Sequence, residues 1–196
     1  MALHTLIVLF VLADLVLTKL SLVAISQVKP QKLFLIFDKS HDFDYAAFSQ
    51  NSINEDVSQI LEQLVTWECD ILIYWLDKDP TLGSVVPKGL DWVFGQVEDA
   101  IILEGNCLPS SFFFYFCQTL LERYRTDFQV MAINGDNFLF SRFQPQYSYY
   151  FSKYFHISAW ATWRRAWKFF NVSMDSWIEF KAENRLSQIC QTSDEL

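Results

Sequence analysis

The stretch Ala100-Ile101-Ile102-Leu103-Glu104-Gly105-Asn106-Cys107-Leu108-Pro109 decides the fold class of this chain. Its first four residues form the short apolar run that is typical of a buried parallel strand, and a carboxylate and a turn follow. Ser110, Ser111 and the segment Phe112–Arg125 then predict a helix with a polar N-terminal cap. Because ligands bind just beyond the carboxyl ends of strands in open α/β sheets, residues 104–106 are a candidate binding site.

Segments with the character of strands and helices alternate along the rest of the chain. Apolar runs predict strands at Thr5–Leu12, Lys32–Asp38, Asp70–Leu76, Ala100–Leu103 and Phe128–Asn134. Helical spacing of apolar residues predicts helices at Asp14–Gln27, Glu55–Trp67, Lys88–Val97 and Phe112–Arg125. This alternation indicates βαβ units and therefore an α/β fold with a mostly parallel sheet flanked by helices.

Composition limits the classes of protein and partner. The chain has 196 residues, of which 52% are hydrophobic, so we expect one domain with a sizeable core. A net charge of -8 argues against nucleic acid as a partner, because binding to phosphates needs clustered basic charge. The four cysteines are far apart, which predicts free thiols in a reducing compartment rather than a zinc site or disulfides.

The first apolar run, Leu6–Ala13, is too short to span a membrane and lacks both the basic start and the cleavage site of a signal peptide. We therefore interpret it as an interior strand. This predicts a cytoplasmic protein without a transmembrane segment.

Aromatic residues crowd the segment from Phe143 to Trp177. Trp160, Trp163 and Trp167 follow an i, i+3, i+7 pattern, which predicts one face of a helix. A core stripe is the favoured interpretation, and an aromatic wall that stacks on a sugar or a base is the alternative. In the second case Arg164 or its neighbour Arg165 would reach phosphate or hydroxyl groups, and adjacent residues of a helix do not share a face.

Other candidate residues also have two interpretations. Glu104 is either a ligand of a bound group or a polar strand end. Asp136 and Asn137 either line a sugar pocket or belong to an ordinary turn after Gly135. His156 is interpreted as a hydrogen-bonded core residue, with a ligand or base as the alternative.

Several motifs together resemble a bacterial family of nucleotide-diphospho-sugar transferase-like proteins with the GT-A glycosyltransferase fold. The similarity covers nearly the whole chain, and the tryptophan-rich run is its most specific part. The residues that carry it are Val28–Pro30 with Lys32–Asp38, Gly89–Phe94, Ile101–Pro109, Phe112–Tyr124, Asn134–Phe138, Tyr149–His156 and Trp160–Lys168.

The resemblance implies a single GT-A-like domain over residues 1–196. Residues 1–135 would form the half that binds the nucleotide-sugar, and residues 136–196 an aromatic-rich segment on the acceptor side. By the same resemblance, the nucleotide-sugar site contains Asp38, Glu104, Asn106 and Asp136, and the acceptor side contains Trp160, Trp163 and Arg164.

A GT-A enzyme holds a divalent cation, Mn²⁺ or Mg²⁺, through an acidic motif that also neutralises the departing diphosphate. In the resembling proteins this motif reads Glu-Asp-Asp before Cys-Leu-Pro, whereas here it reads Glu104-Gly105-Asn106, so the implied metal ligands are Glu104 and Asn106. The family also continues beyond the position of Leu196, into a segment that by analogy supplies the catalytic base. This predicts a truncated C-terminal part and leaves the catalytic residues unassigned.

Two functions follow from the resemblance and the departures from it. The first is transfer of a sugar from a nucleoside-diphosphate sugar to a hydroxyl acceptor, for example on another sugar. The second is a catalytically inactive, truncated relic of such an enzyme, or a binding module.

Overall fold

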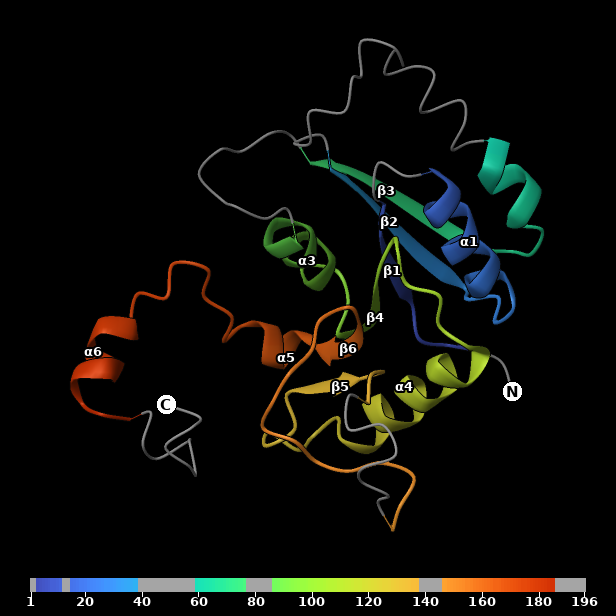
Figure 1. The fold of residues 1–196 in the computed structure, drawn as a ribbon. Helices are drawn as coiled ribbons and strands as arrows, with labels where there is room; N and C mark the ends of the chain where they lie inside the picture. The colour runs from blue at the N-terminus through green and yellow to red at the C-terminus, as the bar shows by residue number, and fades with distance from the viewer. Residues whose placement is uncertain (1–2, 12–14, 39–58, 77–85, 138–145, 186–196) are drawn as a thin grey trace.

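A six-stranded sheet forms the centre of the molecule (Figure 1). The computed structural model describes residues 3–11, 15–38, 59–76, 86–137 and 146–185. The strand order is β3-β2-β1-β4-β6-β5. The strands are β1 (Ile7–Val11), β2 (Lys32–Asp38), β3 (Asp70–Leu76), β4 (Asp99–Glu104), β5 (Ala132–Asn134) and β6 (Ala159–Trp163). The first four run parallel to one another, and β6 runs antiparallel to both of its neighbours.

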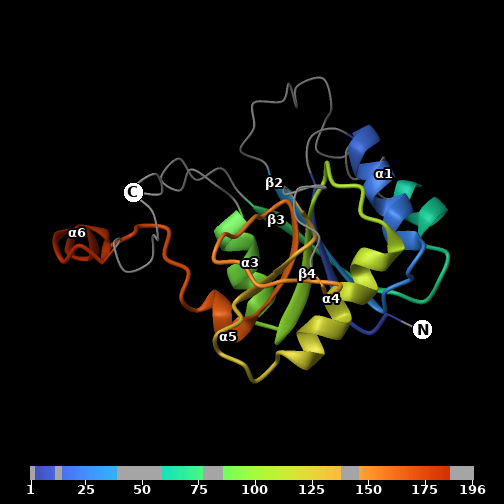
Figure 2. The same ribbon diagram turned by 60° about the horizontal axis from the view of Figure 1, so that its bottom comes forward.

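Helices cover both faces of this sheet (Figures 1 and 2). On one face lie α1 (Leu15–Ser26), α4 (Ser111–Arg123) and a helical segment at residues 59–64. On the other lie α3 (Val86–Phe94) and α5 (Arg164–Trp167). The short helix α6 (Trp177–Ala182) stands apart from these layers and buries none of its residues. No helix in the described part of the chain is long and apolar enough to cross a bilayer.

Two hydrophobic clusters, one on each face of the sheet, hold the layers together. The central strand β1 contributes side chains to both clusters, because successive side chains of a strand point to opposite faces. Ile7, Leu9 and Val11 pack toward α1 and α4, whereas Val8 and Phe10 pack toward α3. All five are buried. Full burial of one such side chain stabilises the fold by about 1.5–3 kcal/mol, so this strand is a major part of the core.

The structure confirms the predicted α/β architecture with a mostly parallel sheet flanked by helices. The predicted strands Lys32–Asp38 and Asp70–Leu76 are confirmed at both ends. The other elements begin or end within a few residues of the expected positions, except that the strand predicted at Phe128–Asn134 begins only at Ala132. Leu12, Asp14 and the first residues of the predicted helix Glu55–Trp67 lie outside the described residues.

One predicted element is wrong. The tryptophan run does not lie along one helix, because Ala159–Trp163 forms β6, which is paired with β4 on one side and β5 on the other. The period of a strand is two, so Trp160 and Trp163 face opposite sides of the sheet. Trp160 packs in the cluster beside α3, and Trp163 packs in the cluster beside α4. Only Trp167 is helical, in α5.

The pairing of β6 with β4 and β5 also brings both predicted halves of the chain into one sheet. The division at residue 135 therefore remains a prediction about function, not a visible boundary between layers.

Candidate functional site

The direction of the strand connections reverses between β1 and β4. The chain passes from β1 to β2 in one direction across the sheet, and it later crosses from β3 back past β1 to β4. The carboxyl ends of the strands at such a reversal are where open α/β sheets bind ligands. Residues 12–14, which follow β1, lie outside the described residues. The described part of this candidate site is therefore the turn after β4.

Backbone and side-chain hydrogen bonds hold this turn from two sides. The amide of Cys107 donates to the carbonyl of Glu104 at 2.9 Å. The buried hydroxyl of Ser21, in α1, lies 3.0 Å from the carbonyl oxygens of both Gly105 and Cys107. On the opposite side, the amide of Glu104 donates to the carbonyl of Ser158 at 3.2 Å. The turn is thus fixed between α1 and the residue that precedes β6.

Two acidic side chains act on the thiol within this turn. Burial raises the pKa of Glu104. Burial also raises the pKa of the Cys107 thiol. The backbone hydrogen bond with Glu104 lowers this pKa, whereas the charges of Glu104 and Asp136 raise it. The sulfur donates to the carbonyl of Ser158 at 3.0 Å. Glu104 and Asp136 are therefore both close enough to this sulfur to act on its charge.

Asp136 reaches this region from β5. Because β6 is antiparallel to both β4 and β5, the carboxyl ends of β4 and β5 lie at the same edge of the sheet. The amide of Gly135 donates to the carbonyl of Ala159 at 3.0 Å. A Cβ atom at Gly135 would lie 2.6 Å from Cε2 of Phe113, so glycine is needed for this close approach. The next residue is Asp136, whose Oδ2 atom is buried without a hydrogen-bond partner.

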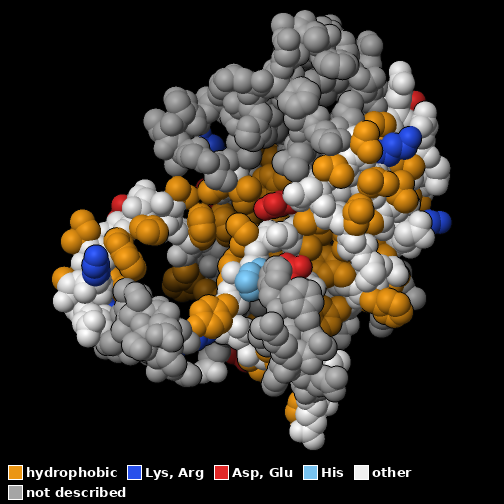
Figure 3. All heavy atoms as spheres, in the orientation of Figure 1, with side chains coloured by type: hydrophobic (Ala, Val, Ile, Leu, Met, Phe, Trp, Pro, Cys, Tyr) orange, Lys and Arg blue, Asp and Glu red, His pale blue; other side chains and the backbone are white. Residues whose placement is uncertain are grey.

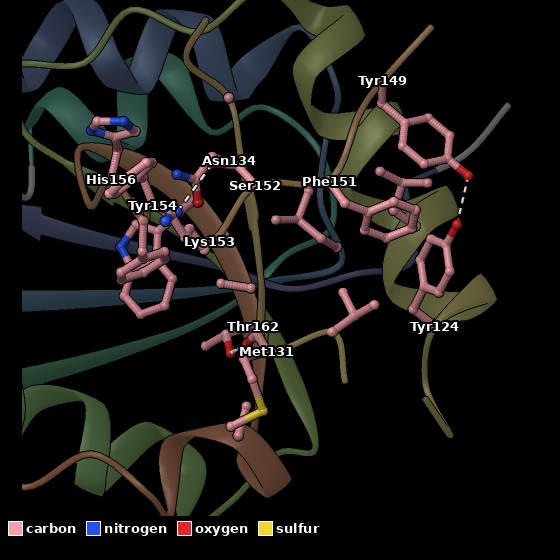
Figure 4. A pocket seen from close by; sticks show the side chains of 18 of the residues that line it. Tyr124, Met131, Asn134, Tyr149, Phe151, Ser152, Lys153, Tyr154, His156 and Thr162 are labelled. Atoms are coloured by element: carbon pink, nitrogen blue, oxygen red, sulfur yellow. Dashed lines mark hydrogen bonds between the residues drawn. The ribbon is translucent and has the colours of Figure 1, made fainter. Parts of the chain in front are cut away.

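A cavity of about 930 Å³ lies along the edge strand β5 (Figure 4). Its size is within the range of pockets that hold small-molecule ligands. It is lined by aromatic rings with polar side chains between them. The lining residues include Tyr124, Asn134, Asp136, Asn137, Tyr149, Tyr150, Phe151, Ser152, Lys153, Tyr154, Phe155, His156, Trp160, Thr162, Trp167 and Phe170.

Residues 148–156, which we call the aromatic cover, form much of this lining. At one end the hydroxyl groups of Tyr149 and Tyr124 lie 2.6 Å apart (Figure 4). At the other, the ring of Phe155 meets that of Trp160 edge to face, with their centroids 5.0 Å apart. Seen from outside, hydrophobic side chains surround a hollow in the molecule, and acidic side chains and a histidine lie near its rim (Figure 3).

Some residues predicted from the sequence meet at this site. Asp136 and Trp160 line the cavity, whereas Glu104 and Asn106 lie in the turn after β4 and are not among its lining residues. Asp38 ends β2, at the same edge of the sheet but with β1 between it and β4, and its side chain lies outside the described part of the structure.

Trp163 does not reach the cavity. It is 2% exposed, lies in the core on the opposite face from Trp160, and donates its ring N–H to the carbonyl of Leu121 at 3.1 Å.

The two neighbouring arginines also do not line the cavity. The Arg164 guanidinium donates to the carbonyl of Val97 and forms an ion pair with Glu98 at 2.7 Å. Arg165 donates to the carbonyls of Tyr124, Arg125 and Val130, each at 2.9 Å. Its guanidinium also lies over the rings of Trp163 and Phe128, at 4.3 and 5.2 Å from their centroids. Arg165 therefore caps the carboxyl end of α4.

Sequence reasoning favoured the wrong environment for one polar residue of the cavity and did not single out another. His156 was expected in the core, and this is wrong, because the residue is exposed and lines the cavity. Asn134, which ends β5, was not singled out. Its place at the end of a predicted strand, directly before Gly135 and Asp136, is the signal that could have identified it.

The described side chains include no group of three His, Cys, Asp or Glu residues that could hold a metal ion. The turn after β4 supplies one carboxylate, from Glu104, and one amide oxygen, from Asn106. Magnesium is typically bound by one or two protein carboxylates together with substrate phosphates. This donor set therefore fits a cation shared with a bound diphosphate, and it does not form a cage made of protein atoms alone.

No known family model matches this chain, and no curated protein does. Among solved structures, the chain is similar to the 4-diphosphocytidyl-2C-methyl-D-erythritol synthase of Anaerococcus prevotii DSM 20548. The TM-score is 0.46 and the sequence identity 13%, and the match covers 92% of this chain and 84% of that one.

Proposed function

We propose that this chain is a glycosyltransferase-like protein that binds a nucleoside-diphosphate sugar at the carboxyl edge of its sheet and a hydroxyl acceptor in the neighbouring cavity. The observation that supports this most is the junction of two features. The turn after β4 lies at the reversal of strand order, and Asp136, which lines the cavity, follows β5 at the same edge of the sheet. A transfer reaction needs two such adjoining sites.

The donor site of this proposal consists of Glu104 and Asn106 in the turn, Asp136 beyond it and Asp38 at the end of β2. Glu104 and Asn106 would hold a divalent cation together with the phosphates of the donor. When bound, the cation supplies positive charge to the departing diphosphate. The turn itself contributes rigidity, because Ser21 and Ser158 fix its backbone on both sides.

The acceptor site of this proposal is the cavity. Its aromatic rings suit the flat faces of a sugar, and the amides of Asn134 and Asn137 can exchange hydrogen bonds with hydroxyl groups. Trp160 belongs to this site directly. Trp163 and Arg164, which the resemblance also places on the acceptor side, support it from the sheet and from the end of β6.

A second candidate function is binding of a nucleotide-sugar without transfer. The metal ligands in the turn favour this second function. One carboxylate supplies less negative charge to hold a cation than the paired carboxylates of the resembling proteins do. Loss of charge stabilisation at the leaving oxygens is worth several kcal/mol in metal-assisted catalysis.

Calorimetric titration tests the donor site. We expect the protein to bind UDP or GDP, and to bind it more tightly with Mn²⁺ present. Release of UDP from UDP-glucose, or of GDP from GDP-mannose, is then measured with methyl glycosides as acceptors. Binding with release supports transfer, and binding without release supports the second function. Absence of nucleotide binding would show that both are wrong.

A further inference from the structure

We propose that the carboxylate of Asp136 accepts the proton of the acceptor hydroxyl during sugar transfer. This inference rests on the proposed function and adds a catalytic residue to it. It is carried by the position of Asp136, by the state of its buried oxygen and by its relation to the turn after β4.

The backbone fixes the position of Asp136. The preceding residue, Gly135, donates its amide to Ala159 of β6 and packs so closely against Phe113 that no larger residue fits without movement. The following residue, Asn137, accepts a hydrogen bond from the hydroxyl of Tyr150 in the aromatic cover, at 3.3 Å. Asp136 thus lies between two anchored residues, at the wall of the cavity.

The Oδ2 atom of Asp136 is buried and has no hydrogen-bond partner. Leaving a buried acceptor unsatisfied costs about 1–3 kcal/mol, and more for a charged group, so such atoms need an explanation. Three other acidic side chains of the described residues do have partners. Asp99 binds Arg125, Asp91 accepts from Trp167, and Asp175 accepts from Asn171. Because Asp136 lines the cavity, a ligand hydroxyl that reaches this oxygen would supply the missing donor.

Asp136 also lies at the edge of the sheet that carries the donor site. It follows β5, and the carboxyl ends of β4 and β5 lie at this same edge because β6 is antiparallel to both strands. Asp136 therefore lies at the junction of the turn and the cavity. In a transfer reaction, this is where the acceptor hydroxyl must meet the anomeric carbon of the donor.

The step balances with the substrates already proposed. The acceptor oxygen forms a bond to the anomeric carbon, and the bond from that carbon to the diphosphate oxygen breaks. The proton of the acceptor hydroxyl passes to Asp136, and the bonding electron pair leaves with the nucleoside diphosphate. The carboxyl then loses its proton to water as the products leave.

The test compares Asp136→Asn, which keeps the shape and removes the base, with Asp136→Glu, which keeps a carboxylate. Asp175→Asn is the matched control, because Asp175 is exposed and is not among the residues that line the cavity. Binding of UDP or GDP with Mn²⁺ and release of nucleoside diphosphate from UDP-glucose or GDP-mannose to methyl glycosides are measured for each. For Asp136→Asn we expect a release rate, measured at saturating nucleotide-sugar, that is lower by about 10²–10⁴-fold, which is the usual contribution of a positioned base. Asp136→Glu should recover part of that rate, and Asp175→Asn should match the wild type.

The remaining outcomes are distinguishable. If the wild type releases nucleoside diphosphate and Asp136→Asn does so within about threefold of its rate, Asp136 is not the base and the proposed function stands. If Asp136→Asn loses nucleotide binding but keeps its thermal stability, Asp136 acts only in the donor site, where the proposed function also places it, and the inference is wrong. If it loses both, the rate of Asp136→Glu decides, because a base requires that variant to remain more active than Asp136→Asn. A wild type that binds no nucleotide overturns the proposed function and this inference with it.

Discussion

Arg164 and Arg165 are adjacent in the sequence, yet the structure predicts that their replacement by alanine has very different effects on stability. Arg165 joins the carboxyl end of α4 to β6 and to the segment before β5, through three carbonyl groups and two aromatic rings. Arg164 makes one carbonyl contact and one ion pair, with a partner, Glu98, that is largely exposed.

The magnitudes follow from these contacts. A net hydrogen bond contributes about 0.5–1.5 kcal/mol, and a cation–π contact at a partly exposed site about 0.5–1 kcal/mol. In the variant, water replaces some of the hydrogen bonds that the guanidinium made. We therefore expect Arg165→Ala to lower the free energy of unfolding by about 2–4 kcal/mol. For Arg164→Ala we expect about 1 kcal/mol, because exposed ion pairs contribute little.

Thermal unfolding followed by circular dichroism measures the difference. For a chain of this length, 1 kcal/mol corresponds to roughly 2–4 °C, so the melting temperature should fall by roughly 5–15 °C for Arg165→Ala and by a few degrees for Arg164→Ala. Arg165→Lys should resemble the alanine variant, since an ammonium group cannot span three carbonyls in the fixed geometry of a guanidinium. Equal melting temperatures for the two alanine variants would refute the capping argument. Lost UDP or GDP binding at unchanged stability would restore the phosphate role that the sequence suggested for this pair.

Two substitutions and one alkylation experiment test the turn after β4 and the core. Ser21→Ala removes the donor that faces the carbonyls of Gly105 and Cys107, and we expect it to lower the free energy of unfolding in urea by about 1–3 kcal/mol. Glu104→Gln should remove the effect of Mn²⁺ on UDP or GDP binding in calorimetry. Because the pKa of Glu104 is raised in the folded state, the wild type loses stability as pH rises above the ordinary value of 4.5, and this variant should lose less between pH 4.5 and 7 in urea unfolding. The Cys117 thiol is fully buried and its pKa is raised by burial, so mass spectrometry should find it alkylated by iodoacetamide only after unfolding.

The parallel part of the fold could be predicted because its signal is local. The runs that form β2 and β3 are continuous, apolar and bounded by polar or turn residues, which is the pattern typical of strands in a parallel sheet. Glu104 could be placed at a site for the same reason, since a carboxylate after such a run lies at the carboxyl edge of the sheet.

The antiparallel part could not be predicted in this way. Trp160, Trp163 and Trp167 fit a helical period by spacing alone, but β6 satisfies its backbone through pairing on both sides, and its partners β4 and β5 are distant in the sequence. Tertiary pairing therefore overrode the local pattern. The structural role of Arg165 was hidden for a related reason, because the carbonyls that it caps belong to residues 124–130.

The aromatic cover also has a consequence for how this protein could diversify. Residues 148–156 line the cavity but do not pair with a strand of the sheet. They are held mainly by ring contacts and side-chain hydroxyl groups. Their sequence can consequently drift without disturbing strand register. Homologues with this scaffold are expected to differ in ligand preference chiefly through substitutions in that segment, while the residues that anchor the β4 turn stay the same.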